Sequence, residues 1–112
     1  MTDDYFTIAV EHAATGGDGA VASLVRLAGE LDIEARDRVR DTLLDVIEGV
    51  RDGTVVVDLG QLRFIDSEGI SALIEGYLAA SSSGGSFRVV NANGIVKRVI
   101  TVTGLEHLLC PP

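Results

Sequence analysis

Hydrophobic and polar residues in the first quarter of the chain alternate in the way that is typical of β-strands. Residues 5–12 alternate weakly, and residues 20–27 are again rich in apolar side chains. Between them lies a glycine-rich segment, residues 15–19, which has neither the spacing nor the lysine of a phosphate-binding loop and is interpreted as a turn. This pattern predicts a β-hairpin.

The spacing of the apolar residues then changes to the three- and four-residue steps of a helix. Asp32 precedes this pattern as a natural N-cap, because its carboxylate can accept hydrogen bonds from the first helical amides. Asp52 and Gly53 follow the pattern and are expected to end the helix. The predicted apolar stripe consists of Ile33, Val39, Leu43, Ile47 and Val50.

A second unit of strand and helix occupies the middle of the chain. Residues 54–59 have the composition of a buried strand, which Gly60 is expected to end. Either Asp66 or Ser67 is then a suitable N-cap for a helix. Gly76 lies inside this helix and costs about 1 kcal/mol relative to alanine unless close packing requires it. The apolar positions at helical spacing are Ile70, Leu73, Ile74, Tyr77 and Leu78.

The last third of the chain contains a loop of serine and glycine, residues 81–86, and a short strand, residues 87–90. Residues 95–100 are rich in β-branched side chains, which favours a strand, but their apolar positions also fit one face of a helix. We predict a helix there. The resulting order β-β-α-β-α-β-α has crossovers long enough for parallel strand pairs, so it predicts an α/β fold with a mixed sheet and helices packed on it.

The composition adds size and charge to this picture. A chain of 112 residues with 46% hydrophobic residues fits one domain over residues 1–112 with one core. Its net charge of −8 opposes binding to nucleic acids, whose phosphates attract lysine and arginine. The basic residues form no patch, and those within residues 36–51 alternate with acids and are interpreted as a solvated helix face.

No pattern in the chain indicates a bound metal, a cofactor or a membrane span. Cys110 is the only cysteine, so it cannot form an internal disulfide and is interpreted as an incidental thiol. His12 and His107 have no neighbours at metal-ligand spacing and are expected at the surface. The first residues lack the features of a signal peptide and no run of about 18 apolar residues occurs, so we expect a cytoplasmic protein.

Three segments of the chain together resemble the STAS domain of bacterial anti-sigma factor antagonists. They are Gly-Glu-Leu-Asp at residues 29–32, a block at residues 56–69 that ends in Phe-Ile-Asp-Ser-Glu-Gly, and Val-Thr-Gly-Leu at residues 102–105. The Asp-Ser-x-Gly core follows a predicted strand, and the other two segments lie at the expected distances from it. The resemblance covers nearly the whole chain and implies a STAS-like domain with a sheet of four to five strands.

The resemblance implies a partner-switching regulator that is not an enzyme. In that family the unphosphorylated protein binds an anti-sigma factor and so frees a sigma factor for RNA polymerase, and phosphorylation of the serine that matches Ser67 abolishes binding. The anti-sigma factor is typically a serine kinase with a histidine-kinase-like ATP-binding fold, and a metal-dependent serine phosphatase reverses the modification. ATP and the metal then belong to these partners. The expected partner-contact residues are Asp32, Asp66, Ser67, Glu68 and Gly69.

Glu68 departs from the family pattern, because many members have a second serine or threonine at this position. It leaves one hydroxyl in the motif and places a carboxylate beside the proposed phosphate. A phosphoserine adds about −1.5 to −2 charges, and a helix N-terminus offers it unpaired amides and a favourable dipole. With Asp66 and Glu68 on either side, the added charge predicts partner release through local repulsion, with little backbone change.

The residues alone leave other roles open. Without the resemblance, Ser67 would be an ordinary N-cap, and Asp66 is either a cap or a recognition residue. Asp58 either fixes the loop after its strand or accepts a phosphate, although the acidic pair of a receiver domain is missing. A hydrolase is disfavoured because the motif lacks the first glycine of the nucleophile elbow. The remaining alternative is a STAS phospho-switch or scaffold in a pathway without a sigma factor.

Overall fold

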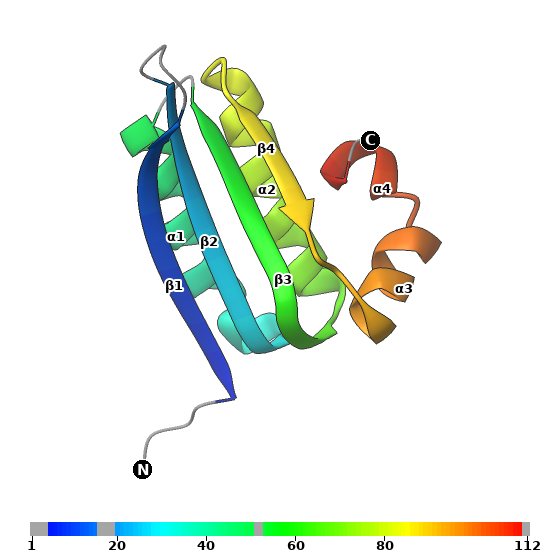
Figure 1. Ribbon diagram of the computed structural model, residues 1–112. Coiled ribbons are helices and arrows are strands. Elements are labelled where there is room, and N and C mark those ends of the chain that lie inside the picture. Colours follow the sequence, from blue (N-terminus) through cyan, green and yellow to red (C-terminus); the bar gives the residue numbers. More distant parts are fainter. Residues whose placement is uncertain (1–4, 16–19, 51–52, 111–112) are drawn as a thin grey trace.

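The computed structural model describes residues 5–15, 20–50 and 53–110, and its centre is a four-stranded sheet (Figure 1). The strands are β1 (Phe6–Thr15), β2 (Ala20–Leu31), β3 (Thr54–Ile65) and β4 (Ser86–Val90). They lie in the order β1-β2-β3-β4. β1 pairs with β2 in antiparallel orientation, whereas the β2–β3 and β3–β4 pairs are parallel. The predicted mixed sheet is therefore confirmed, with four strands.

The predicted hairpin is formed by β1 and β2, and its two strands are longer than the sequence pattern indicated. Its turn at residues 16–19 lies outside the described residues. At the opposite end, Gly29 faces Phe6 and has φ +98°, a conformation that glycine adopts without strain. A Cβ atom there would lie 1.9 Å from the carbonyl oxygen of Tyr5. The glycine of the Gly-Glu-Leu-Asp segment thus lets the first strand pass close to β2.

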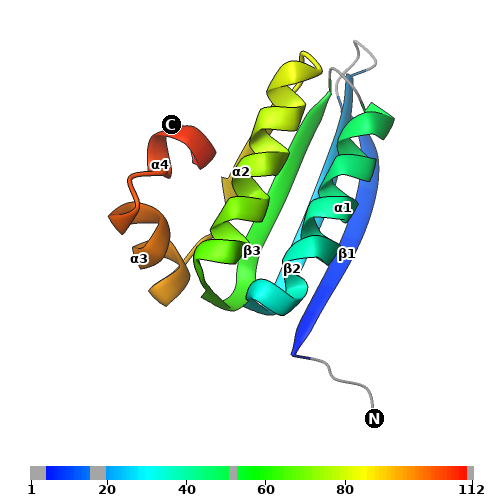
Figure 2. The same cartoon turned by 180° about the vertical axis from the view of Figure 1, so that it is seen from behind.

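The described residues form four helices. Helices α1 (Ile33–Val50) and α2 (Ser67–Ser82) cover one face of it, as Figure 2 shows. Helix α3 (Gly94–Val102) packs against β3, and the short helix α4 (Glu106–Leu109) packs against β4. The helix predicted over residues 95–100 is confirmed, whereas α4 was not predicted. Among the described residues, no helix combines the length and the apolar character needed to cross a bilayer.

The predicted apolar stripes of α1 and α2 are correct except at their margins. Ile33 and Leu78 are 64% and 55% exposed, so their assignment to the buried faces is wrong. Each lies two residues before a buried alanine, Ala35 or Ala80, and two helical residues are separated by about 200° around the axis. The buried stripe of α1 consists of Ala35, Val39, Leu43, Val46, Ile47 and Val50.

Gly60 does not end β3, contrary to the prediction, because the strand continues to Ile65. Arg26 pairs with Asp58 and Ala28 with Gln61, so β3 uses one residue more than β2 between these pairs. This is a β-bulge. The Asp58 side chain accepts a hydrogen bond from the Gly60 amide at 2.8 Å, which satisfies a donor that the bulge removes from the ladder. The glycine marks an irregularity inside the strand, not its end.

Gly76 is a point of close approach between the middle of α2 and its neighbours. A Cβ atom at this position would lie 2.9 Å from Cε2 of Phe87 and 3.0 Å from Cδ1 of Leu43. Phe87 lies on β4 and Leu43 on α1, so both neighbours are buried parts of the core. Close packing therefore explains why a glycine stands inside this helix.

We expect Gly76→Ala to lower the free energy of unfolding by about 1–3 kcal/mol, because the new methyl group must displace buried side chains. Gly49→Ala is the matched control, since Gly49 lies in α1 and, apart from the adjacent backbone of its own helix, no atom lies within 4 Å of the added Cβ. The control is expected to raise stability by about 0.5 kcal/mol through helix propensity. Urea denaturation of both variants measures the difference, and equal stabilities would contradict the packing argument.

Cys110 gives a pH-dependent test of the packing beside α4. Burial of its thiol, followed by the negative charge of Glu106, raises the pKa of Cys110. Because the thiolate is the reactive form, alkylation is expected to need a higher pH in the folded protein than in the chain unfolded in urea. The folded state should also lose stability as pH rises from the unfolded pKa to the folded one, since the unfolded chain gives up its proton first. Iodoacetamide rates across the alkaline range provide the measurement, and coincident midpoints would contradict the burial of the thiol.

Candidate functional site

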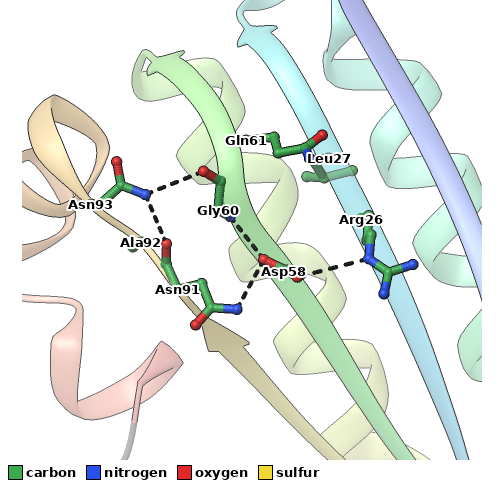
Figure 3. A pocket seen from close by; sticks show the side chains of 8 residues that line it. All are labelled: Arg26, Leu27, Asp58, Gly60, Gln61, Asn91, Ala92 and Asn93. Atoms are coloured by element: carbon green, nitrogen blue, oxygen red, sulfur yellow. Dashed lines mark hydrogen bonds and ion pairs between the residues drawn. The ribbon is translucent and has the colours of Figure 1, made fainter.

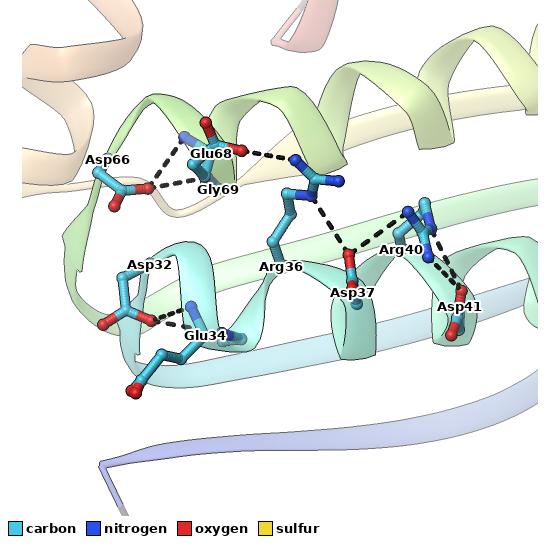
Figure 4. A network of polar contacts seen from close by, with 10 residues as sticks. Asp32, Glu34, Arg36, Asp37, Arg40, Asp41, Asp66, Glu68 and Gly69 are labelled. Atoms are coloured by element: carbon cyan, nitrogen blue, oxygen red, sulfur yellow. Dashed lines mark hydrogen bonds and ion pairs between the residues drawn. The ribbon is translucent and has the colours of Figure 1, made fainter.

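The parallel register of β2 and β3 places the starts of α1 and α2 side by side. Leu31 is paired with Ile65 at the carboxyl ends of these strands, and the Asp66 amide donates a hydrogen bond to the Leu31 carbonyl at 3.2 Å. Each strand is followed by an aspartate and then by a helix. Figure 4 shows Asp32 and Asp66 in equivalent positions at the two helix starts.

Both aspartates cap their helices, as predicted. Oδ1 of Asp32 accepts hydrogen bonds from the amides of Glu34 at 3.0 Å and Ala35 at 3.3 Å. Oδ1 of Asp66 accepts bonds from the amides of Glu68 and Gly69, both at 3.0 Å. Of the two cap candidates for α2, the structure selects Asp66, which has the extended backbone typical of this position.

Ser67 is the first residue of α2 and is exposed. Because Asp66 is the cap, the Ser67 hydroxyl is not needed to satisfy the helix start, and none of the described residues forms a hydrogen bond with it. A hydroxyl in this position can be modified without dismantling the cap.

The first turn of α2 has few amides left for an anion. Asp66 accepts from Glu68 and Gly69 through its carboxylate and from Ile70 through its carbonyl oxygen, at 3.0 Å. This leaves the amide of Ser67 itself. The expectation that the helix N-terminus offers a phosphate several unpaired amides is therefore wrong, because the aspartate cap already uses them.

Gly69 brings α2 against the ends of the two strands. It is buried, and a Cβ atom there would lie 2.7 Å from both Cγ and the carbonyl oxygen of Leu31 and 2.8 Å from Cγ1 of Ile65. The glycine of the Asp-Ser-x-Gly core thus sets the position of the Ser67 turn. Its contact with a partner stays a prediction.

An ion pair between α1 and α2 lies beside Ser67 and was missed by the sequence analysis. Nη1 of Arg36 is 2.6 Å from Oε1 of Glu68, and Nε of Arg36 is 3.3 Å from Oδ1 of Asp37 (Figure 4). The hydrogen bond to Glu68 raises the pKa of Arg36, partial burial acts in the opposite direction, and the charge of Asp37 adds to the rise. The guanidinium therefore stays charged. Arg36 had been assigned to a solvated face, but its side chain is only 33% exposed.

The ion pair continues along α1 as a row of alternating charges. Arg40 contacts Asp37 at 3.4 Å and Asp41 at 3.2 Å. Large apolar side chains are also exposed close to the caps in sequence, since Ile33 follows Asp32 and Phe64, 41% exposed, precedes Ile65. Exposed apolar side chains therefore stand within two residues of both caps in sequence.

Asp58 belongs to a separate polar network on the sheet. Its Oδ1 accepts hydrogen bonds from the Gly60 amide at 2.8 Å and from Nδ2 of Asn91 at 3.2 Å, and Nε of Arg26 is 3.9 Å from its Oδ2 (Figure 3). Nδ2 of Asn93 donates to the carbonyl oxygens of Gly60 and Asn91. Asp58 therefore fixes the bulge and the segment that follows β4, not a loop after its own strand. An open hollow of about 550 Å³ is lined by Arg26, Leu27, Asp58, Gly60, Gln61, Asn91, Ala92 and Asn93.

The histidines and acidic residues form no metal centre in the part of the chain that the structure describes, where no group of three or more potential ligands converges. His12 is exposed, and its Nδ1 is 2.7 Å from Oγ of Ser23, a buried hydroxyl that thereby gains a partner. His107 is exposed on α4.

Comparisons with known proteins identify the family that this fold and this motif define. The family model described as "Mlab, STAS domain" matches residues 16–110. The anti-sigma F factor antagonist of Paenibacillus polymyxa is 33% identical over 86 residues, which cover 77% of this chain and 74% of that protein. The chain belongs to the STAS domain family, and its relatives include anti-sigma factor antagonists.

Solved structures agree with this assignment. The crystal structure of an anti-sigma factor antagonist from Mycobacterium paratuberculosis is 28% identical and has a TM-score of 0.76, with 97% of this chain and 86% of that chain covered. The anti-sigma factor antagonist SpoIIAA, 22% identical, matches in fold in its unphosphorylated form with a TM-score of 0.70, over 90% of this chain and 85% of that chain. The phosphorylated form of the Bacillus protein SpoIIAA matches with a TM-score of 0.64, over 90% and 88%. The predicted STAS-like fold is confirmed.

We expect Asp66→Ala to lower the free energy of unfolding by about 1 kcal/mol, because the amides of Glu68 and Gly69 lose their acceptor. Asp66→Asn keeps an acceptor oxygen and is expected to lose only a few tenths of a kcal/mol. Asp45→Ala controls for the removal of a carboxylate, since Asp45 is exposed in the interior of α1. Urea denaturation tests the three variants, and an Asp66→Ala variant as stable as Asp45→Ala would contradict the capping role.

Proposed function

We propose that this protein is an anti-sigma factor antagonist, whose unphosphorylated form binds an anti-sigma factor and whose phosphorylation on Ser67 abolishes that binding. The observation that carries the proposal is the exposed Ser67 hydroxyl at the start of α2, which the Asp66 cap leaves unused. Relatives support it, because one is named an anti-sigma F factor antagonist and the antagonist SpoIIAA has been solved in a phosphorylated form.

The physical basis of the switch is charge at a surface that a partner would cover. A phosphate on Ser67 adds about −1.5 to −2 charges between Asp66 and Glu68. Because the cap has used the nearby amides, the helix start absorbs little of this charge. A partner that covers the site must then desolvate the phosphate or meet it with like charge, and both weaken the complex.

The fold itself tolerates the modification. Ser67 is exposed, and the strand ends beneath it are held by the buried residues Leu31 and Ile65. The output of the switch is therefore partner release with little backbone movement. The residues proposed to contact the partner are Asp32, Asp66, Ser67, Glu68 and Gly69.

The proposed partner is an anti-sigma factor that is also a serine kinase with a histidine-kinase-like ATP-binding fold. Its binding would free a sigma factor for transcription, and a metal-dependent serine phosphatase would restore the unphosphorylated protein. ATP and metal would be bound by these enzymes. The exposed apolar side chains of Ile33 and Phe64 supply surface that such a protein partner can bury.

Affinity capture from a lysate of the native cells, with identification by mass spectrometry, tests the proposal. We expect Ser67→Ala to retain a protein with a histidine-kinase-like ATP domain and Ser67→Asp to recover at least about tenfold less of it, because a buried like charge costs more than 1.4 kcal/mol. Ser82→Asp is the matched control, since it adds the same charge at the exposed opposite end of α2.

The control is expected to behave like the wild type. Equal recovery by Ser67→Ala and Ser67→Asp would refute the switch. Capture of partners without such a kinase would assign the domain to a STAS pathway that does not control a sigma factor.

A further inference from the structure

The Arg36–Glu68 ion pair places a cationic group against the residue that follows Ser67. Arg36 lies in the first turn of α1, and its contact with Glu68 connects the two helix starts (Figure 4). Nη1 contacts Glu68 and Nε contacts Asp37, whereas Nη2 has no ion pair or hydrogen bond with the described residues. The guanidinium therefore keeps unused donors next to the residue that follows the proposed phosphorylation site.

We propose that Arg36 is a positioning residue of the switch: when Ser67 carries a phosphate, the Arg36 guanidinium pairs with the phosphate and leaves the Glu68 carboxylate without its partner. This inference rests on the proposed function of Ser67 and names the residue that responds to its modification. No change in the backbone is required.

The reach needed for this exchange is short. Glu68 follows Ser67 directly, so their Cα atoms are about 3.8 Å apart. Phosphorylation lengthens the serine side chain, and arginine has a long stem that adopts many rotamers. Because Arg36 already crosses from α1 to the second residue of α2, the proposal asks only for rotation of its outer side-chain bonds toward the first.

The charges favour the exchange. A phosphate monoester carries up to two negative charges on three oxygens, against one charge on the Glu68 carboxylate. The planar guanidinium matches the geometry of a phosphate and can bind it with two parallel N–H groups. The present contact with Glu68 uses one nitrogen, so the phosphate offers Arg36 a stronger partner.

The exchange spreads the negative charge of one modification over two side chains at the surface. In the unphosphorylated protein, Arg36 neutralises Glu68, and a partner meets a balanced pair. In the phosphorylated protein, Arg36 is drawn to the phosphate, whose charge it compensates only in part, and Glu68 is exposed as an unpaired anion. A residue that departs from the family pattern thus becomes a second element of the repulsion.

The test uses the full chain with phosphoserine placed at position 67 during synthesis, which requires neither the kinase nor the partner. Titration followed by ³¹P NMR reports the second pKa of the phosphate. A nearby cation favours the dianion, so Arg36→Gln is expected to raise this pKa, with about threefold tighter proton binding or more. The phosphate pKa of Arg36→Lys should lie between those of the wild type and Arg36→Gln, because lysine keeps the positive charge but cannot donate two parallel N–H groups.

Arg40→Gln is the matched control, because it removes the same charge one helical turn away on the same face of α1, where Arg40 contacts Asp37 and Asp41. Its phosphate should titrate as in the wild type. If Arg36→Gln leaves the phosphate pKa at the wild-type value, or raises it no more than Arg40→Gln does, the inference is wrong.

A double-mutant cycle separates competition by Glu68 from its simple charge effect. If the exchange takes place, Glu68→Gln should lower the phosphate pKa by the same small amount with Arg36 and in the Arg36→Gln background, because it removes only a neighbouring negative charge. A strong lowering confined to the protein that keeps Arg36 would show that Glu68 still holds the guanidinium and would overturn the exchange. This result is independent of the capture experiment, so the two proposals can fail separately.

Discussion

The structure depends on the parallel alignment of β2 and β3 at their carboxyl ends. Leu31 and Ile65 are paired there, both side chains are buried, and the Leu31 carbonyl accepts the Asp66 amide. Since each strand passes directly into a helix, this single register brings two helix starts to one edge of the sheet. The positions of the residues in the candidate site follow from this register. It also brings Gly69 so close to Leu31 that a Cβ atom on Gly69 would not fit.

The two capping aspartates determine the chemistry of that edge. A helix start with free amides would attract an anion and reduce its influence on the surroundings. Here the carboxylate of Asp66 has taken this role, so the hydroxyl beside it is exposed while the amides are occupied. The local charge balance then depends on side chains, and Arg36 is the cation that α1 contributes. In the proposed switch, the cap keeps the helix start fixed while the ion pair responds to the modification.

Local sequence patterns predicted most of the fold because the relevant signals lie close together in the chain. The hairpin, the helix starts at Asp32 and Asp66, and the helix at residues 95–100 each depend on residues a few positions apart. The bulge at Gly60 was misread as a strand end, because an extra residue can be recognised only against the partner strand. Ile33 was assigned to the core because it is apolar and begins the helical pattern. Which side of a helix is buried depends on how the helix lies on the sheet, and here the buried side begins at Ala35. The Arg36–Glu68 pair joins residues 32 positions apart, and no spacing rule indicates it.

The order of strand connections also bears on how this chain folds. The β1–β2 pair is formed by neighbouring segments, whereas the two parallel pairs close only after helices of 18 and 16 residues have been placed. Loop-closure entropy makes such pairings slow, and parallel strands cannot form from a turn alone. The edge that carries Ser67 is therefore complete only when β3 has paired with β2. In a newly made chain, the surface proposed to bind the partner exists only from that step onward.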